Sequence, residues 1–334
     1  MRRAAFAVAA AVALVALPGC GPGGGSGADL TIYSGRNEEL VGDLIDRFER
    51  ESGLGVDVRY GDSAELAATI AEEGDNSPAD VFFSQDAGAL GAVENNLAAM
   101  PRPVLDAVPD RFRDPEGRWA GVSGRARVIV YDTDKFEDSE VPDSVFDLTD
   151  ERWKGKVGLA PPNASFQAFV SAMRAEVGDE RTRRWLEAMK DNEPRLYDNN
   201  IQTVEAVGQD EIELGLVNHY YLYELKREDP SLAAANHFPA RGDPGSLINA
   251  AGVGILETTD DRRNAERFAR FLVSRDAQRY FSERTAEYPL IEGVRRPAGV
   301  PPLEEVVGPQ VELGLLGDKL RSTLELLDEL GFTT

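Results

Sequence analysis

Two adjacent tyrosines, Tyr220 and Tyr221, are the residues of this sequence whose type and spacing most directly suggest chemistry. A phenol, with an ordinary pKa of about 10, becomes a hard anionic oxygen donor once its proton is displaced, and a hard trivalent cation would displace it. The pair follows a predicted strand at residues 213–217. At such a strand-to-helix junction both rings can face one ligand, although successive positions of a regular helix diverge by about 100°. Aromatic packing at an element boundary is the alternative explanation, and Tyr223 is interpreted as packing.

An anion could be held where Asn163, Ala164 and Ser165 precede a predicted helix at residues 166–177. The start of a helix offers free backbone N–H groups and the positive end of the helix dipole. The side chains of Asn163 and Ser165 would add to these groups. Plain capping of the helix explains the same residues equally well.

Four other polar residues have two interpretations each. Arg125 and Arg127 alternate on one face of a predicted strand, where they could complement an anion or form ion pairs between lobes. Asn37 could be only a helix cap, and Asn200 only a turn residue.

Alternating strands and helices must position these residues. Period-two hydrophobic segments predict strands at residues 30–33, 55–60, 80–84, 127–131, 157–160, 195–197, 213–217 and 252–256. Helical spacing predicts helices at residues 40–48, 66–71, 166–177, 181–189, 265–272 and 316–327, and a short one from residue 203. Ser63 is expected to cap the second helix. This order predicts an α/β protein with doubly wound sheets, in which ligands collect beyond the carboxyl ends of the strands.

Composition excludes several function classes. The chain has 334 residues and a formal charge of −23, which argues against binding to nucleic acid or to an anionic membrane surface. One cysteine and two histidines exclude a disulfide framework, a thiolate cluster and a polyhistidine metal site. No P-loop, H-E-x-x-H or G-x-S-x-G motif is present, so an enzyme is not expected. The length exceeds what one core usually serves and predicts two lobes.

The N-terminus predicts export. Residues 1–19 combine two arginines with an apolar run at residues 4–17, as a signal peptide does. The sequence LPGC at residues 17–20 resembles the lipobox of bacterial lipoproteins, which predicts a lipid on Cys20; a plain secretory signal is the alternative. The glycine-rich remainder of residues 20–28 predicts a flexible tether.

The chain from Thr31 to near its C-terminus resembles the ferric-ion-binding proteins of bacterial iron ABC importers. The matching blocks are TIYSGRNEE, EEGDNSPADVFFSQDA, SGRARVIVYD, WKGKVGLA, NHYYLYEL, DPGSL and AEYPL. The resemblance implies a class II periplasmic-binding fold, in which two lobes, each a doubly wound mixed sheet flanked by helices, close on a ligand in the cleft between them. The lobes are expected at residues 29–124 plus 251–301, and 125–250 plus 302–334.

The resemblance also implies residue roles. Tyr220 and Tyr221 match the family's Fe³⁺ ligands, and Arg125 is a further anion-binding candidate. The family's cradle for a synergistic anion falls on Asn163, Ala164, Ser165, Asn200 and Asn218. The implied cargo is Fe³⁺ with phosphate, carbonate or citrate. The implied partners are the permease and ATPase subunits of an ABC importer, which a monomeric, lipid-anchored binding protein would serve outside the cell membrane.

Two departures from the family pattern concern the first lobe. Asn37 stands where the best-matching members have histidine, and Gln85 where they have glutamate. Members with an extra tyrosine after the helix-start loop offer no replacement, because Phe166 stands near that place. Asp86 and Glu65 are nearby in sequence and could substitute. Iron binding would therefore depend on two phenolates with exogenous anions or water, or the iron would arrive as a ferric chelate.

Two alternatives stay open. Relatives with the same fold carry organic cargo such as a phosphonate, thiamine or a polyamine, and an iron-dependent absorption band would separate them from an iron carrier. A secreted hydrolase or oxygenase belongs to a different class, and turnover assays would reveal it.

Overall fold

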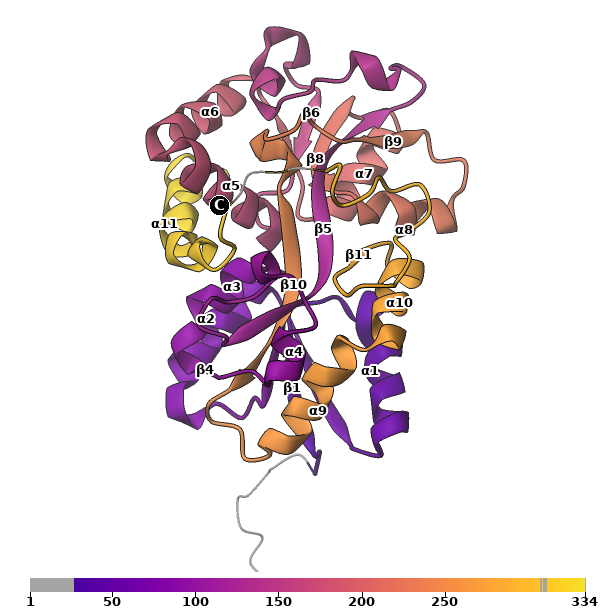
Figure 1. Cartoon of the computed structure of the whole chain (residues 1–334). Coiled ribbons are helices and arrows are strands. Elements are labelled where there is room, and N and C mark those ends of the chain that lie inside the picture. Colours follow the sequence, from indigo (N-terminus) through magenta and orange to yellow (C-terminus); the bar gives the residue numbers. More distant parts are fainter. Residues whose placement is uncertain (1–26, 307, 309–310, 334) are drawn as a thin grey trace, which may run out of the picture.

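The computed structural model describes residues 27–306, 308 and 311–333, which form two lobes joined by long strands (Figure 1). The predicted signal peptide, Cys20 and most of the predicted tether lie outside the described residues. No helix within the described part of the chain is long and apolar enough to cross a membrane.

The first lobe begins with three parallel strands in the order β2-β1-β3, where β1 is Leu30–Ser34, β2 is Val56–Tyr60 and β3 is Val81–Ser84. Two helices make the connections, namely α1 (Glu38–Ser52) and α2 (Ser63–Glu73). The apolar positions of α1 recur at helical spacing and are buried, as the sequence predicts. Capping of α2 differs from the prediction. Asp62 accepts hydrogen bonds from the backbone of residues 64 and 65, whereas Ser63 is the first helical residue.

Two long strands connect the lobes. They are β5 (Trp119–Asp132) and β10 (Ile248–Leu256), which run antiparallel. The first part of β5 pairs with β10, and its last part pairs with β8 and β9 of the second lobe. The sequence predicts β5 only from Arg127 and β10 only from Gly252, so both predicted starts are too late.

The sheet of the second lobe has the strand order β5-β8-β6-β7, and β9 also pairs with β5. Its strands and helices follow one another along the chain. They are β6 (Val157–Leu159), α5 (Ala164–Val177), α6 (Asp179–Asp191), β7 (Arg195–Leu196), α7 (Asn200–Gly208), β8 (Leu214–Asn218), α8 (Tyr220–Glu228) and β9 (Ala234–His237). The start of α8 was predicted from the strand-to-helix junction at the tyrosine pair, and β9 was not predicted. Each of the others was predicted within a few residues.

Several short elements carry no sequence signal strong enough to predict them. They are α3 (Ala87–Ala92), β4 (Leu97–Ala98), α4 (Arg102–Leu105), α10 (Arg275–Arg284) and β11 (Tyr288–Pro289). Single turns of 3₁₀-helix lie at residues 74–76, 94–96, 110–112, 138–140, 145–149, 151–153 and 244–246. Helix α9 (Arg262–Leu272) was predicted and packs its apolar face on β10.

The last helix, α11 (Leu315–Glu329), contacts both lobes (Figure 1). Its first turn packs against α3, where Gly317 and Gly91 bring their backbones into direct contact. Its later turns pack against α5, where the hydroxyls of Thr323 and Ser171 are 2.9 Å apart. The helix therefore bridges the lobes beside the two crossing strands. The lobe boundaries given above, which assign it to the second lobe alone, stay a prediction.

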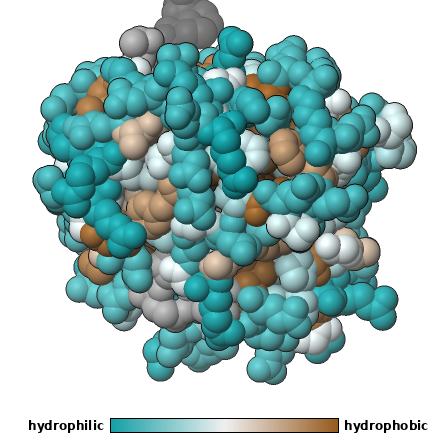
Figure 2. All heavy atoms as spheres, turned by 90° about the horizontal axis from the view of Figure 1, so that it is seen from above, coloured by the Kyte–Doolittle hydropathy of each residue, from teal (hydrophilic) through white to brown (hydrophobic). Residues whose placement is uncertain are grey.

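The outer surface of the second lobe is mainly hydrophilic. Figure 2 shows hydrophobic residues only in separated patches on this face. This agrees with a chain whose large apolar side chains are mostly buried, with Leu196 and Leu315 as the exposed exceptions among the described residues.

Candidate functional site between the lobes

Tyr220 and Tyr221 lie at the junction between β8 and α8. Strand β8 ends at Asn218, His219 already has helical backbone angles, and α8 starts at Tyr220. The two rings are stacked, with centroids 4.2 Å apart and planes inclined by 33°. Both side chains are almost fully buried. The junction thus places two phenol groups together, as the sequence predicts.

The two hydroxyls have different surroundings. Tyr221 Oη accepts a hydrogen bond from Gln85 Nε2, 3.3 Å away, at the end of β3 in the first lobe. Tyr220 Oη is buried without a hydrogen-bond partner among the described residues. A buried hydroxyl in this condition costs free energy, and binding sites are a common reason for it. The lobes therefore meet at the tyrosine pair, and one of its phenols is free to bind.

His219 holds the junction in place and is not a candidate ligand. Its Nδ1 accepts a hydrogen bond from the backbone N–H of Ala126 at 3.1 Å, and its Nε2 donates to the carbonyl of Ala286 at 2.8 Å. Burial lowers the pKa of His219 to about 4. The imidazole is therefore neutral, and both nitrogens are engaged.

Burial raises the pKa of Tyr221 well above its ordinary value, and the neighbouring Tyr220 raises it further. The positive charges of Arg125 and Arg36 oppose this shift. In the absence of metal the phenol therefore keeps its proton at neutral pH. A cation that binds here must displace that proton.

A buried ion cluster stands beside the tyrosines. Arg36, just after β1, binds Glu287 through two hydrogen bonds of 2.9 and 2.7 Å. The guanidinium of Arg125 lies 3.7 Å from the same carboxylate. Burial alone would raise the pKa of Glu287, but the two arginines outweigh it and hold that pKa at about 2. Ser123 and Thr285 donate further hydrogen bonds to the carboxylate.

The predicted anion cradle is assembled at the start of α5. Asn163 Oδ1 accepts hydrogen bonds from the backbone N–H and the hydroxyl of Ser165, at 3.0 and 2.6 Å, so it caps the helix. Ala164 is the first helical residue and is buried. Asn200 Nδ2 donates to Ser165 Oγ at 3.2 Å, and Arg127 donates to the same oxygen at 3.1 Å. Asn200 starts α7 and is not a turn residue.

Arg127 connects this cradle to the tyrosines. Burial lowers its pKa to about 9, and the nearby phenols of Tyr221 and Tyr220 oppose that shift. Its second nitrogen donates to the carbonyl of Leu216 on β8 at 2.7 Å. The cradle and the tyrosine pair are therefore parts of one site.

Several buried polar groups of the site lack partners in the described part of the chain. All three guanidinium nitrogens of Arg125 make no hydrogen bond, although the side chain is fully buried. The same is true of Asn218 Nδ2 and Asn200 Oδ1. Such groups require hydrogen-bonding partners. An anion would supply acceptors to the two donor groups, the guanidinium of Arg125 and Asn218 Nδ2.

The two first-lobe candidates differ from each other. Gln85 reaches the site, as described above. Asn37 is exposed, and its side chain makes no capping hydrogen bond to α1. Asp86 is buried and caps α3 through Ala89 N–H, and burial raises its pKa to about 6. Glu65 is exposed on α2. Of these four residues, only Gln85, a neutral amide, contacts the tyrosines.

Two residues of the site, Arg36 and Glu287, were not predicted from the sequence. Each belongs to one of the matching blocks quoted above, TIYSGRNEE and AEYPL, but nothing in the spacing pairs residues that are 251 positions apart. Within the described residues there is no group of three or more histidine, cysteine, aspartate or glutamate side chains that could hold a metal. Phenol, amide and guanidinium groups therefore dominate the chemistry of the site.

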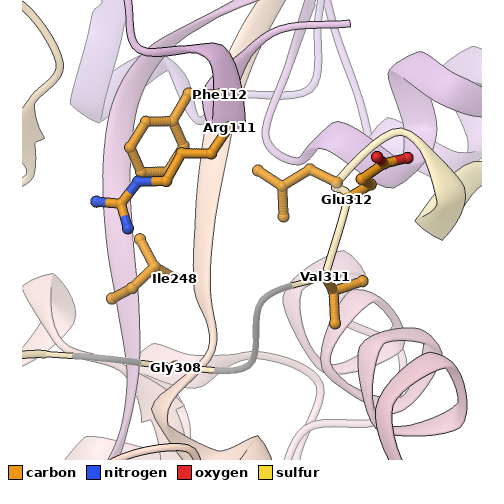
Figure 3. Close-up of a pocket in the computed structure, with 7 residues that line it drawn as sticks. Arg111, Phe112, Ile248, Gly308, Val311 and Glu312 are labelled. Carbon is orange, nitrogen blue, oxygen red and sulfur yellow. The ribbon is translucent and has the colours of Figure 1, made fainter. Parts of the chain in front are cut away.

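A further cavity lies away from the tyrosines. Its volume is about 170 Å³, and Figure 3 shows Arg111, Phe112 and Ile248 on one side of it and Glu312 on the other. None of the predicted site residues lines this cavity.

Comparison with known proteins agrees with this fold. Residues 75–305 match the family model of bacterial extracellular solute-binding proteins. The Fe(3+)-binding periplasmic protein of Serratia marcescens is 31% identical over 307 residues, which cover 90% of each chain.

Two solved structures are also similar. Iron-bound HitA from Pseudomonas aeruginosa has a TM-score of 0.86 at 30% identity and covers 90% of this chain and 99% of its own. The Trichodesmium protein IdiA (FutA), solved with iron and citrate, has a TM-score of 0.77 at 30% identity and covers 91% of this chain and 99% of its own. The chain therefore belongs to the bacterial extracellular solute-binding proteins, in the branch of the ferric-ion-binding proteins.

Proposed function

We propose that this protein captures ferric iron through Tyr220 and Tyr221 and delivers it to the permease of an ABC importer. The observation that carries the proposal is the stacked, buried pair of phenols at the seam between the lobes. Phenolate oxygen is a hard donor suited to Fe³⁺. Relatives whose names and structures record iron support the same cargo.

The direct test is an absorption spectrum with elemental analysis. Ferric citrate added to the iron-free protein should produce a visible phenolate-to-iron charge-transfer band at one iron per chain. Protein purified from its native host should contain iron. If both the band and the iron were absent, iron would be rejected as the cargo in favour of an organic molecule.

Charge favours an anion bound with the iron. Fe³⁺ with two phenolates keeps one positive charge. The buried Arg36, Arg125 and Arg127, with Glu287 and Asp86, whose pKa of about 6 leaves it mostly ionised at neutral pH, add a net one. Gln85 supplies no negative charge. A multiply charged anion such as phosphate, carbonate or citrate would offset this excess, with the cradle of Asn163, Ala164, Ser165, Asn200 and Asn218 and the free donors of Arg125 to receive it.

Iron capture should consequently depend on the supplied anion. Removal of phosphate, carbonate and citrate is expected to weaken ferric binding by at least roughly tenfold, because an uncompensated buried charge is costly. The measurement is a competition titration against a ferric chelator with a non-coordinating buffer anion, then with each anion restored. Equal affinity throughout would contradict the proposed role of the cradle.

Iron release should be linked to proton uptake. The raised pKa of Tyr221 means that its phenol is protonated in the iron-free protein, so iron and protons compete for the same oxygen. Binding is therefore strong at higher pH and is lost as the pH falls. A pH titration that follows the charge-transfer band should show uptake of more than one proton per iron released. Release without proton uptake, beyond that of the freed anion, would contradict phenolate ligation.

A second candidate function keeps the same cleft for an anionic organic cargo such as a phosphonate. The fully buried guanidinium of Arg125, without a hydrogen bond, is the observation that favours it. The iron-dependent band separates the two functions. The family consists of transport components, and no catalytic role is proposed.

The proposal includes the location of the protein. The relative in Serratia marcescens is named as a periplasmic protein. We propose that acylation of Cys20 holds the monomer at the outer face of the cell membrane, within reach of the permease. Incorporation of labelled fatty acid, lost in a Cys20→Ala variant, tests the anchor.

A further inference from the structure

Three arginines line a pocket between α8 and the segment that follows β11. The pocket has a volume of about 410 Å³, and its charged lining is Arg227, Arg295, Arg296 and Glu283. The three arginines form no ion pair with any residue that the structure describes. The lining therefore has a net charge of about two positive units, in a chain whose formal charge is −23.

Hydrogen bonds tie α8 to the segment on the other side of this pocket. Tyr223 Oη donates to the carbonyl of Gly299 at 2.9 Å, and Arg227 donates to the carbonyl of Arg284 at the end of α10. The pocket also adjoins the site described above, because Ala286, which lines it, accepts the hydrogen bond of His219. Figure 1 shows α8 and α10 next to each other on this side of the molecule.

Two hydrogen bonds hold the backbone of the segment that carries Arg295 and Arg296. Ser282 on α10 donates a 2.6 Å hydrogen bond to the carbonyl of Arg295, and Tyr288 Oη donates to the carbonyl of Pro301. Arg295 and Arg296 are exposed and their guanidinium groups are accessible. Guanidinium groups bind oxyanions through paired hydrogen bonds.

We propose that this pocket is a second anion site, distinct from the cradle at α5, for a small oxyanion with two or more charges. Its occupancy stabilises the contact between α8 and the 284–299 segment. Without an anion, the like charges of Arg227, Arg295 and Arg296 repel one another across the pocket, and a bound anion removes this repulsion. Because α8 begins with the tyrosine pair, the anion also slows the release of iron; this second effect rests on the proposed function.

The binding itself can be tested without iron. Phenylglyoxal modifies accessible arginines, and peptide mass spectrometry reports the rate at each one. In the iron-free protein, citrate or sulfate at about ten times its Kd should slow modification of Arg295 and Arg296 about tenfold relative to chloride at equal ionic strength. Arg102 and Arg263, which are exposed on α4 and α9, should be unaffected. No protection at Arg295 and Arg296, or equal protection at all four arginines, overturns the site.

The effect on iron is tested with two double variants of equal charge. Sulfate, which binds iron weakly, should slow iron transfer to a competing chelator in the wild type and in Arg102→Gln/Arg263→Gln. It should have no effect in Arg295→Gln/Arg296→Gln. Protection from phenylglyoxal with equal release rates in both variants would overturn the coupling. If the protein carried no iron, the labelling result would still stand, so the failures of the two proposals are distinguishable.

Discussion

Replacement of Tyr220 or Tyr221 with phenylalanine is expected to remove ferric binding while the fold remains intact. Each change deletes one phenol oxygen and preserves the ring, so the 4.2 Å stacking of the pair is retained. Loss of a group that only supports a metal ligand typically costs 10- to 100-fold in affinity, so loss of a ligand should exceed roughly 100-fold. The measurement is a titration with ferric citrate that follows the charge-transfer band.

Tyr131→Phe is the matched control. This tyrosine is also buried, on β5, but it lies outside the site. The control should retain the band and its affinity. Thermal unfolding of the three variants should differ little, because Tyr220 Oη has no partner to lose and Tyr221 Oη only one. Full binding in both site variants would show that the pair serves aromatic packing alone.

Replacement of Glu287 with glutamine should have the largest effect on stability. The change preserves volume but removes the carboxylate that pairs with the buried Arg36 and lies beside the buried Arg125. Removal of one partner from a buried ion pair typically lowers the free energy of unfolding by about 3–5 kcal/mol. Denaturant unfolding with an unchanged m-value should report the loss as a lower midpoint.

The pH dependence has a definite sign. Because the pKa of Glu287 is held at about 2 instead of 4.5, its stabilisation is present above pH 4.5 and is lost as the pH falls toward 2. The difference between wild type and variant should shrink over that window. Glu329→Gln is the control, since Glu329 also binds an arginine, Arg183, through two hydrogen bonds, at 3.0 and 2.7 Å, but on the surface. A similar effect in both variants would contradict the role of burial.

Local patterns predicted the tyrosine pair and most of the helices. The pair was placed correctly at a strand-to-helix junction because a buried strand directly precedes it in the sequence. Strand β5 was predicted too short for a physical reason. Its early residues include Gly121 and Gly124, which disfavour strands in general. Here glycine is required, because a Cβ at Gly121 would lie 2.7 Å from the carbonyl oxygen of Phe112.

The ion pair of Arg36 and Glu287 was not predicted, because its residues are far apart in the sequence. Arg36 and Glu287 neutralise each other only because the fold joins two loops from distant parts of the chain. Conversely, Asn37 is a neighbour of Arg36 in sequence but points to solvent, since its side chain lies on the exposed side of the α1 start. Spacing predicts which side chains can meet on one element, whereas meetings between elements depend on the tertiary structure.

The contact between Gly91 and Gly317 has a mechanical consequence. Where α11 crosses α3, two backbones touch without side chains between them, and an added methyl group at Gly317 would lie 2.4 Å from the backbone of Gly91. The same helix is fixed to α5 by hydroxyl contacts. Any hinge motion of the lobes bends β5 and β10, and it must also pivot or slide α11 at this bare crossing. A fluorescent dye near the C-terminal end of α11, paired with one on the first lobe, would convert that pivot into an optical signal for cargo capture.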